Sequence, residues 1–311
     1  MRPKIGLALG GGGARGFAHI GALKVLEEHR IPIDIIVGSS MGAIIGGAYS
    51  LRPDAKLLEK RVLTFSEKKT IKRLESLAAK DEQEERMLIF KRLATFVTDV
   101  YLWNLTAIKG CIIEAAQIEE IIRDLVDKKD FSQTKIRFAS VATDVNTGKQ
   151  AIFTEGNLCD AIYASSAIPG VFPPKQIKGQ LLIDGGIVNL MPADCAKSLG
   201  AEIVIGIDVD MDIKPKHFKH GYDIIFRADD IRRHELNLLK MKNADIIISP
   251  EVKNLSWAHF SKAEEAIKKG EEATRLMMPL IKRKTKKINL ISRFKSLFSN
   301  LSKRQGGQIW L

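Results

Sequence analysis

Three short motifs place residues that can do chemistry directly after apolar segments. The first is Gly38-x-Ser40-x-Gly42, which follows the apolar run 33–37 and precedes a small-residue segment. A serine on a sharp turn between a strand and a helix exposes its hydroxyl, and the N-terminus of that helix favours negative charge developing beside it. We interpret Ser40 as a nucleophile, with a purely structural turn as the alternative.

The second motif is a glycine-rich segment, residues 10–16 (GGGGARG), after the apolar run 5–9. Consecutive glycines let backbone N–H groups approach a ligand closely, so the loop suits an oxyanion or a phosphate. Gly11-x-Gly13-x-x-Gly16 also matches the dinucleotide fingerprint, which requires an acidic residue at the end of the next strand. Asp34 stands at the start of that strand instead, which disfavours a nucleotide-dependent enzyme without eliminating it.

The third motif is Asp184-Gly185-Gly186, directly after the apolar run 181–183. An aspartate at the end of a buried parallel strand lies on the edge where α/β proteins bind ligands, whereas the triplet alone is typical of a simple turn. No histidine has an obvious place beside these motifs. An α/β-hydrolase order would place an acid and then a histidine after the serine, and His217, His220 and His234 stay open as triad candidates of this kind.

The elements that must position these motifs alternate between strand and helix. The pattern predicts strands at 5–9, 33–37, 136–143, 151–153, 181–183, 202–208 and 245–248, and helices at 16–29, 43–50, 158–166, 222–240 and 261–283. This order predicts a parallel sheet with crossover helices. Residues 54–130 are rich in Lys, Glu, Leu and Ala, so we expect a helical insertion there.

Taken together, the motifs resemble those of the patatin-like phospholipases, over about residues 5–196. The match comprises the glycine-rich loop, the serine turn, the small-residue segment 164–174 (ASSAIPGVFPP) and the Asp-Gly-Gly triplet, in the order found in that family. The resemblance implies an α/β, parallel-sheet, three-layer patatin-like fold with a helical insertion and a helical C-terminal region. We expect a catalytic domain at 1–210, an α/β extension at 211–281 and a basic amphipathic tail at 282–311.

The resemblance also implies roles for individual residues. Ser40 would be the nucleophile and Asp184 its proton acceptor, in a Ser–Asp dyad that needs no histidine. The expected oxyanion hole is made by backbone N–H groups of Gly11, Gly12, Gly13 and Ala14, with Met41 added by the geometry of the turn. Supporting positions are Arg15, Gly16, Gly38, Gly42, Gly185 and Gly186, where Arg15 either holds the loop or attracts a lipid phosphate.

The implied activity is that of a carboxylic-ester hydrolase of the phospholipase A or lysophospholipase type. It would cleave fatty-acyl esters of a phospholipid or lysophospholipid through an acyl-enzyme, with no cofactor and no metal. The alternative is a catalytically weak, membrane-associated adaptor that keeps the hydrolase fold. The sequence does not determine the lipid headgroup, the acyl chain length or the oligomeric state.

The net charge of +12 is concentrated in one segment. Residues 282–304 carry nine Lys or Arg and no Asp or Glu, which leaves only +3 for the rest of the chain. Apolar residues recur in this basic segment at helical spacing, from Leu290 to Leu301. Such a helix either lies on an anionic membrane surface or packs on the protein's own core. No nucleic-acid-binding motif accompanies the charge, so we expect no nucleic-acid partner.

Composition excludes several other classes of protein. No apolar run approaches the roughly 20 residues that cross a bilayer, and the run 5–9 is too short for a secretory signal. Three widely spaced cysteines exclude a disulfide scaffold and a Cys-x-x-Cys zinc site. These features predict a cytoplasmic protein, with the basic segment as a means of peripheral binding to the inner face of the membrane.

Overall fold

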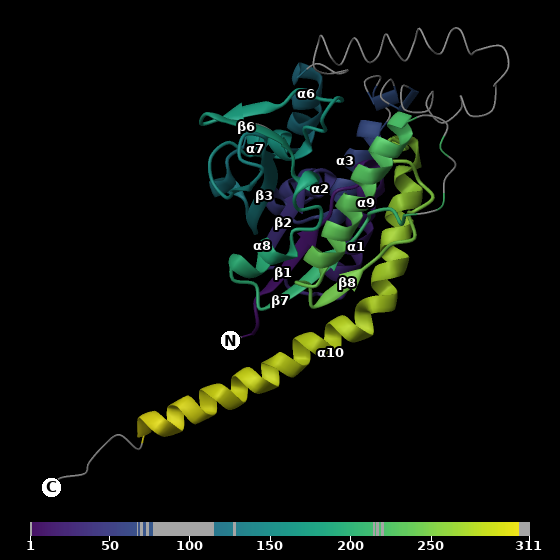
Figure 1. Cartoon of the computed structure of the whole chain (residues 1–311). Helices are drawn as coiled ribbons and strands as arrows, with labels where there is room; N and C mark the ends of the chain where they lie inside the picture. Colours follow the sequence, from purple (N-terminus) through teal and green to yellow (C-terminus); the bar gives the residue numbers. More distant parts are fainter. Residues whose placement is uncertain are drawn as a thin grey trace, which may run out of the picture.

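The structure is a computed structural model of the chain (Figure 1). It describes residues 2–66, 68, 71–72, 75–76, 115–126, 129–213, 215, 218 and 221–304. The expected helical insertion is therefore described at its two ends, where both segments are helical, and residues 77–114 lie outside the described residues.

Eight strands form one mixed sheet in the order β5-β6-β3-β2-β1-β7-β8, and β4 pairs with β3. The strands β1, β2, β3, β7 and β8 are parallel to one another, whereas β4 and β6 run antiparallel to β3 and β5 runs antiparallel to β6. Their bounds are β1 Ile5–Leu9, β2 Ile35–Ser39, β3 Arg137–Asp144, β4 Gln150–Phe153, β5 Lys175–Ile177, β6 Gln180–Asp184, β7 Ile203–Ile207 and β8 Ile246–Ile248.

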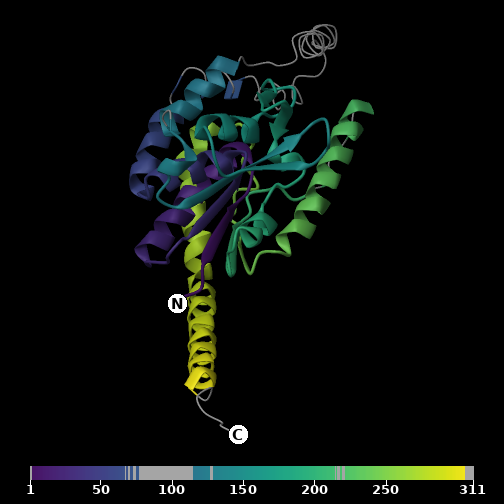
Figure 2. The same ribbon diagram turned by 90° about the vertical axis from the view of Figure 1, so that its left-hand side faces the viewer.

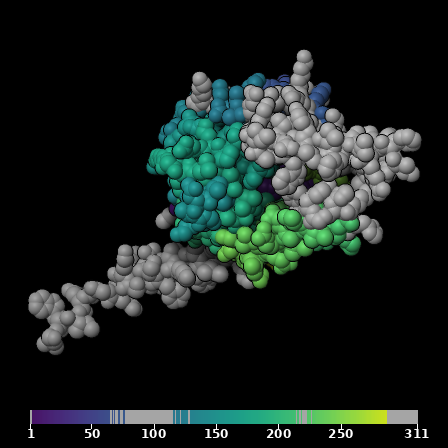
Figure 3. Space-filling view, turned by 45° about the horizontal axis from the view of Figure 1, so that its top comes forward, coloured from purple at the N-terminus to yellow at the C-terminus, as the bar shows by residue number. Residues whose placement is uncertain are grey.

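Helices cover both faces of this sheet, which makes three layers (Figures 1 and 2). The α-helices are α1 Ala18–Glu28, α2 Met41–Leu51, α3 Ala55–Ser66, α6 Ala115–Val126, α7 Leu158–Ser166, α8 Ala193–Ser198, α9 Gly221–Met241 and α10 Ala263–Arg304. Short 3-10 segments occur at Gly13–Phe17, Phe131–Gln133, Gly185–Ile187 and Phe260–Lys262. In the space-filling view of Figure 3, α9 lies at the molecular surface.

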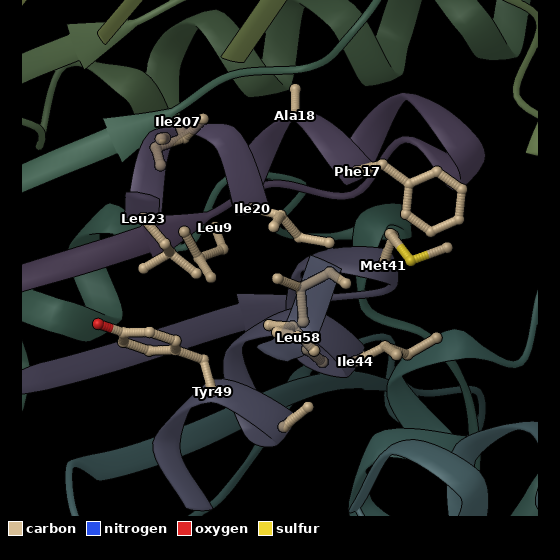
Figure 4. Close-up of a cluster of buried hydrophobic side chains, with 14 of the residues drawn as sticks. Leu9, Phe17, Ala18, Ile20, Leu23, Met41, Ile44, Tyr49, Leu58 and Ile207 are labelled. Atoms are coloured by element: carbon tan, nitrogen blue, oxygen red, sulfur yellow. The ribbon is translucent and has the colours of Figure 1, made fainter. Parts of the chain in front are cut away.

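Alternation along the strands produces two separate apolar layers. On one face, Leu7 and Leu9 of β1 join a large core with α1, α2, α3 and α10, part of which is drawn in Figure 4. On the other face, Ala8 joins a smaller core with Val37 of β2 and residues of α8. Because both faces of β1 and β2 are covered, their sequences are almost continuously apolar.

The register of β3 explains why the serine and aspartate motifs meet. Both β2 and β4 pair with Ser140 and Val141, so they lie on opposite edges of β3. Both β4 and β6 pair with Ala142 and Thr143, so β6 lies on the same edge as β2. Therefore β6 enters where β2 stops, and its last residue, Asp184, lies next to the turn that follows β2.

The predicted α/β three-layer fold with a helical C-terminal region is confirmed, with one addition to the sheet. The expected parallel sheet is present in β1, β2, β3, β7 and β8, whereas β4, β5 and β6 add antiparallel pairs, and short connections join β3 to β4 and β5 to β6. Sequence analysis also missed β5 and α8. The residues of β5 (KQI) form no apolar run, and the six residues of α8 are too few to show a helical periodicity.

Helix α10 belongs to the body in its first half and leaves it in its second. Gly270 of α10 packs directly on α1, and further along Lys284 Nζ donates a hydrogen bond to the main-chain oxygen of Asp245. The helix continues to Arg304, and Figures 1 and 2 show its C-terminal part extending away from the sheet. No helix among the described residues is long and apolar enough to cross a bilayer. The division into domains stays a prediction.

Candidate active site

Ser40 stands on a sharp turn between β2 and α2. Its backbone angles are φ 53° and ψ −124°, so this non-glycine residue lies in the left-handed half of backbone space. A Cβ on Gly38 would come within 2.3 Å of the Gly42 carbonyl oxygen, and one on Gly42 within 2.1 Å of the Leu9 oxygen. The two motif glycines are therefore required because other backbone passes too close for any side chain.

The hydroxyl of Ser40 donates a hydrogen bond of 2.6 Å to Asp184 Oδ2. Both side chains are buried. The N–H of Gly186 donates to the other carboxyl oxygen, Oδ1, at 2.7 Å. Burial raises the pKa of the Asp184 carboxyl to about 6, although the hydrogen bonds from Ser40 and Gly186 act in the opposite direction. Near neutral pH the carboxylate is thus present, and it is a stronger base than an exposed aspartate.

The backbone of Asp184 is fixed on both sides. Its N–H donates to the Ala167 oxygen at 3.0 Å, and its carbonyl oxygen accepts a hydrogen bond of 2.8 Å from Thr143 Oγ1. Gly185 packs so closely against β3 that a Cβ there would lie 2.1 Å from the Val141 oxygen. These contacts hold the carboxylate toward Ser40.

The glycine-rich loop lies next to Ser40, because a Cβ on Gly11 would be 3.1 Å from Ser40 Cβ. Two of the expected oxyanion donors are already engaged: Gly11 N–H donates to the Leu190 oxygen and Ala14 N–H to the Trp257 oxygen. Their assignment to an oxyanion hole is corrected accordingly. The N–H groups of Gly12, Gly13 and Met41 have no acceptor among the described residues.

Two buried side chains hold the carbonyl groups of this loop. Arg15 Nε donates to the Gly12 oxygen at 3.1 Å, and His19 Nε2 lies 2.7 Å from the Gly10 oxygen. Burial lowers the pKa of the Arg15 guanidinium to about 10 and that of the His19 ring to about 4. His19 is therefore neutral, with its proton on Nε2. Of the two roles open for Arg15, these contacts favour holding the loop.

Close packing of the loop on its neighbours explains two more motif glycines. Gly13 has φ +58°, and a Cβ there would lie 2.2 Å from the Trp257 oxygen. A Cβ on Gly16 would lie 2.4 Å from Met41 Cγ, at the start of the helix that follows the serine. The loop and the serine turn are thus in direct contact.

The triad candidates find no support in the described part of the chain, where no histidine hydrogen-bonds to Ser40 or Asp184. His234 Nδ1 lies 3.6 Å from Asp210 Oδ2, and His217 and His220 lie outside the described residues. Asp34, considered for a dinucleotide site, instead pairs with Arg2 and accepts from the Ile5 N–H. Among the described residues, no cluster of His, Cys, Asp and Glu suits a metal ion.

The residues that position the pair were not predicted from the sequence. Thr143 and Ala167 hold Asp184, and Ser165 Oγ accepts the N–H of Ser40 at 2.9 Å. Ser165 and Ala167 belong to the small-residue segment 164–174, which was part of the motif match without a role. Small residues there permit α7 to approach both motifs.

The fold and the site together define a three-layer α/β protein with a serine on a strand–helix turn, paired with a buried aspartate beside a glycine-rich loop. The family model described as patatin-like phospholipase matches residues 7–197. This range includes more than half of the chain and all three motifs. The chain therefore belongs to the patatin-like phospholipase family.

Relatives agree with this assignment over the same region. The chain is 35% identical over 207 residues to a patatin-like phospholipase domain-containing protein of Caenorhabditis elegans, covering 66% of this chain and 13% of that one. It is 33% identical over 208 residues to an uncharacterized NTE family protein of Mycobacterium tuberculosis, covering 67% and 49%. This chain thus spans half or less of the length of these relatives.

Among solved structures, VipD from Legionella pneumophila is similar with a TM-score of 0.47 and 13% sequence identity, covering 89% of this chain and 67% of that one.

Proposed function

We propose that this protein is a serine-dependent lipid acyl hydrolase of the phospholipase A or lysophospholipase type. The observation that carries the proposal is the 2.6 Å hydrogen bond from Ser40 Oγ to the buried carboxylate of Asp184. A hydroxyl is a weak nucleophile unless an adjacent base accepts its proton. Family membership indicates the class of substrate, an acyl ester of a phospholipid or lysophospholipid.

In the proposed mechanism, Ser40 Oγ attacks the ester carbonyl carbon as its proton passes to Asp184. The N–H groups of Gly12, Gly13 and Met41 donate to the oxyanion of the tetrahedral intermediate. The intermediate collapses, the C–O bond to the alcohol breaks, and the alcohol leaves with the proton from Asp184. Water then loses a proton to Asp184 and attacks the acyl carbon. The bond between that carbon and Ser40 Oγ breaks, the fatty acid leaves, and Asp184 returns the proton to Ser40 Oγ.

The basic segment supports a second part of the proposal, that the protein binds anionic membrane surfaces. Nine positive charges without a negative one occur within residues 282–304, and the structure continues α10 as a helix to Arg304. Each Lys or Arg near an anionic surface contributes about 1 kcal/mol. This attraction would bring the protein to the lipid that it cleaves.

The test of the catalytic proposal is covalent labelling by a long-chain alkyl fluorophosphonate. We expect one adduct by intact-protein mass, mapping to Ser40, as the serine oxygen displaces fluoride from phosphorus. Ser40→Ala should show no adduct, and Asp184→Asn should react about 10²–10⁴-fold more slowly because the proton acceptor is lost. Ser140→Ala, which removes another buried hydroxyl that does not contact the pair, is the matched control.

Absence of a fluorophosphonate adduct on the wild-type protein would contradict the proposal. If folded wild-type protein forms no adduct in the presence of anionic vesicles, Ser40 is not activated. The proposal then fails, and the membrane-associated adaptor becomes the better description.

A further inference from the structure

We propose that Ser165 is a positioning residue for Ser40: its hydroxyl holds the serine turn in the conformation from which Ser40 reaches Asp184. The inference rests on the proposed function, since a positioning role requires a reaction at Ser40. Ser165 itself contacts neither substrate nor the reacting oxygen.

A two-step hydrogen-bond relay passes through the Ser165 hydroxyl. The backbone N–H of Ser40 donates to Ser165 Oγ at 2.9 Å, and Ser165 Oγ donates to the Val141 oxygen at 2.5 Å. The side chain of Ser165 is fully buried. A single hydroxyl on α7 therefore connects the serine turn to β3, using both its acceptor and its donor capacity.

The backbone of Ser40 needs such an external support. A non-glycine residue at φ 53° is strained, and such strain persists only where the surroundings over-determine the conformation. The carbonyl oxygen of Ser40 accepts from the N–H groups of Ala43 and Ile44 within its own helix and, at 3.4 Å, from Ser166 Oγ of α7. Among the described residues, Ser165 Oγ is the one acceptor of its N–H.

The same end of α7 also holds the acid. Asp184 N–H donates to the oxygen of Ala167, two residues beyond Ser165. Ser40 and Asp184 are 144 positions apart in the chain, yet the backbone of each is bonded to this short segment. Ser40 is bonded to the side chain of Ser165, whereas Asp184 is bonded to the main chain of Ala167. A change of the Ser165 side chain should therefore alter the serine turn and leave the aspartate in place.

The experiment compares Ser165→Ala and Ser165→Cys with Ser140→Ala. The control also removes a fully buried serine hydroxyl that links β3 and α7, here by a 3.0 Å bond from Ser140 Oγ to the Ala161 oxygen, and it contacts neither Ser40 nor Asp184. Cysteine has a similar shape and is a weaker donor and acceptor, so Ser165→Cys gives a folded intermediate case if the alanine variant does not fold.

Two readouts separate positioning from general stability. The first is the fluorophosphonate reaction, where we expect the maximal rate of labelling to fall about 10–10²-fold in Ser165→Ala, less in Ser165→Cys, and to stay within about twofold in Ser140→Ala. The half-saturating probe concentration should not change, because the probe's binding site is intact. The second is amide hydrogen exchange of the peptide containing residues 36–44, which should be faster in both Ser165 variants than in the control.

Each result decides a different point. Unchanged exchange in residues 36–44 overturns the inference whatever the labelling shows, because Ser165 then does not hold the turn. Faster exchange with a wild-type labelling rate overturns the positioning role. Absence of labelling in the wild type overturns the proposed function, and with it any reaction for Ser165 to support, while the exchange data still report the turn.

Discussion

The Asp184 carboxyl combines burial with a short hydrogen bond to Ser40, and in the proposed mechanism its pKa determines the pH range in which the pair reacts. A pKa of about 6 means that the carboxylate predominates at neutral pH and becomes protonated in mild acid. Only the carboxylate can accept the Ser40 proton. The Thr143 and Ala167 contacts keep it oriented through this change, since both bind backbone atoms.

We therefore expect the rate of fluorophosphonate labelling to rise with pH around a midpoint near 6 and to level off above about 7. At pH 5 the rate should be about tenfold below the plateau, since one pH unit below the pKa leaves a tenth of the carboxylate. The measurement is the labelling rate from pH 4.5 to 8. Asp184→Asn should give a flat profile, and an equal midpoint in that variant would exclude Asp184 as the titrating group.

Asp184 and His19 should make opposite contributions to the pH dependence of folding stability. The raised pKa of Asp184 stabilises the fold below about pH 4, and this contribution is lost as pH rises through 6. The lowered pKa of His19, about 4 when buried, gives stability that is present above pH 6.5 and lost as pH falls toward 4. Each shift corresponds to about 3 kcal/mol.

In the wild type these two effects nearly cancel between pH 6 and 4, and Asp184→Asn removes one of them. We expect this variant to lose about 2 kcal/mol more free energy of unfolding than the wild type between those pH values, because the Asp184 carboxyl is already half protonated at pH 6. Urea unfolding at pH 6 and pH 4 measures the difference. Ser140→Ala, which keeps both titrating groups and the hydrogen bond from Ser40 to Asp184, serves as the control. Parallel curves for Asp184→Asn and wild type would contradict the assignment.

At the scale of elements, residues just before helix α10 hold the glycine-rich loop and the segment that follows it. Ala14 N–H donates to the Trp257 oxygen, and the rings of Phe17 and Phe260 pack edge to face at 5.9 Å. Helix α1, which continues this loop, crosses α10 at two glycines. A Cβ on Gly21 would lie 1.9 Å from the Ile267 oxygen, and one on Gly270 equally close to the Ala18 oxygen.

Because the α1–α10 crossing has no room for a methyl group, Gly270→Ala should push the two helices apart. We expect a loss of about 1–3 kcal/mol in the free energy of unfolding, together with slower labelling of Ser40 as the glycine-rich loop shifts. Urea unfolding and the labelling rate provide the two measurements. Leu276→Ala, on the exposed face of the same helix, should change either value little, and equal effects in the two variants would argue against the crossing.

At the scale of the whole molecule, the positive charge of the basic segment, residues 282–304, lies away from Ser40 and Asp184. The basic segment leaves the body beyond Lys284, which bonds to the residue that precedes β8. Asp245 precedes the amino end of β8, whereas the Ser40 turn follows the carboxyl end of β2, so the two lie at opposite ends of the parallel strands. The arrangement suits a tether that holds the protein near a surface.

We expect the full chain to bind vesicles containing phosphatidylglycerol and to bind phosphatidylcholine vesicles weakly, because the attraction is electrostatic. Reversing four charges within the basic segment (Lys286, Lys287, Arg293 and Lys295 to Glu) should abolish co-sedimentation. The control reverses four exposed lysines elsewhere: Lys56, Lys149, Lys178 and Lys242. Equal loss in both variants would indicate that net charge alone, and no tether, attracts the protein.

The sequence by itself determined the local features of this protein. Apolar runs identified most strands, glycines flanking Ser40 identified a turn with no room for side chains, and the order of motifs identified the family. Each strand, turn and motif depends on residues within one turn or one strand of each other. Short-range sterics and periodicity suffice to predict them.

The family resemblance implied that Ser40 pairs with Asp184, and only the tertiary structure shows why these two groups meet. Asp184 lies beside Ser40 because antiparallel β6 takes over the edge of β3 where β2 ends, an arrangement that a strand pattern does not encode. Gly11 and Ala14 lose their expected role because Leu190 and Trp257, distant in sequence, accept their N–H groups. The hydrogen-bond acceptors of backbone N–H groups in a loop depend on segments that are distant in sequence, so they can be assigned only in the folded chain.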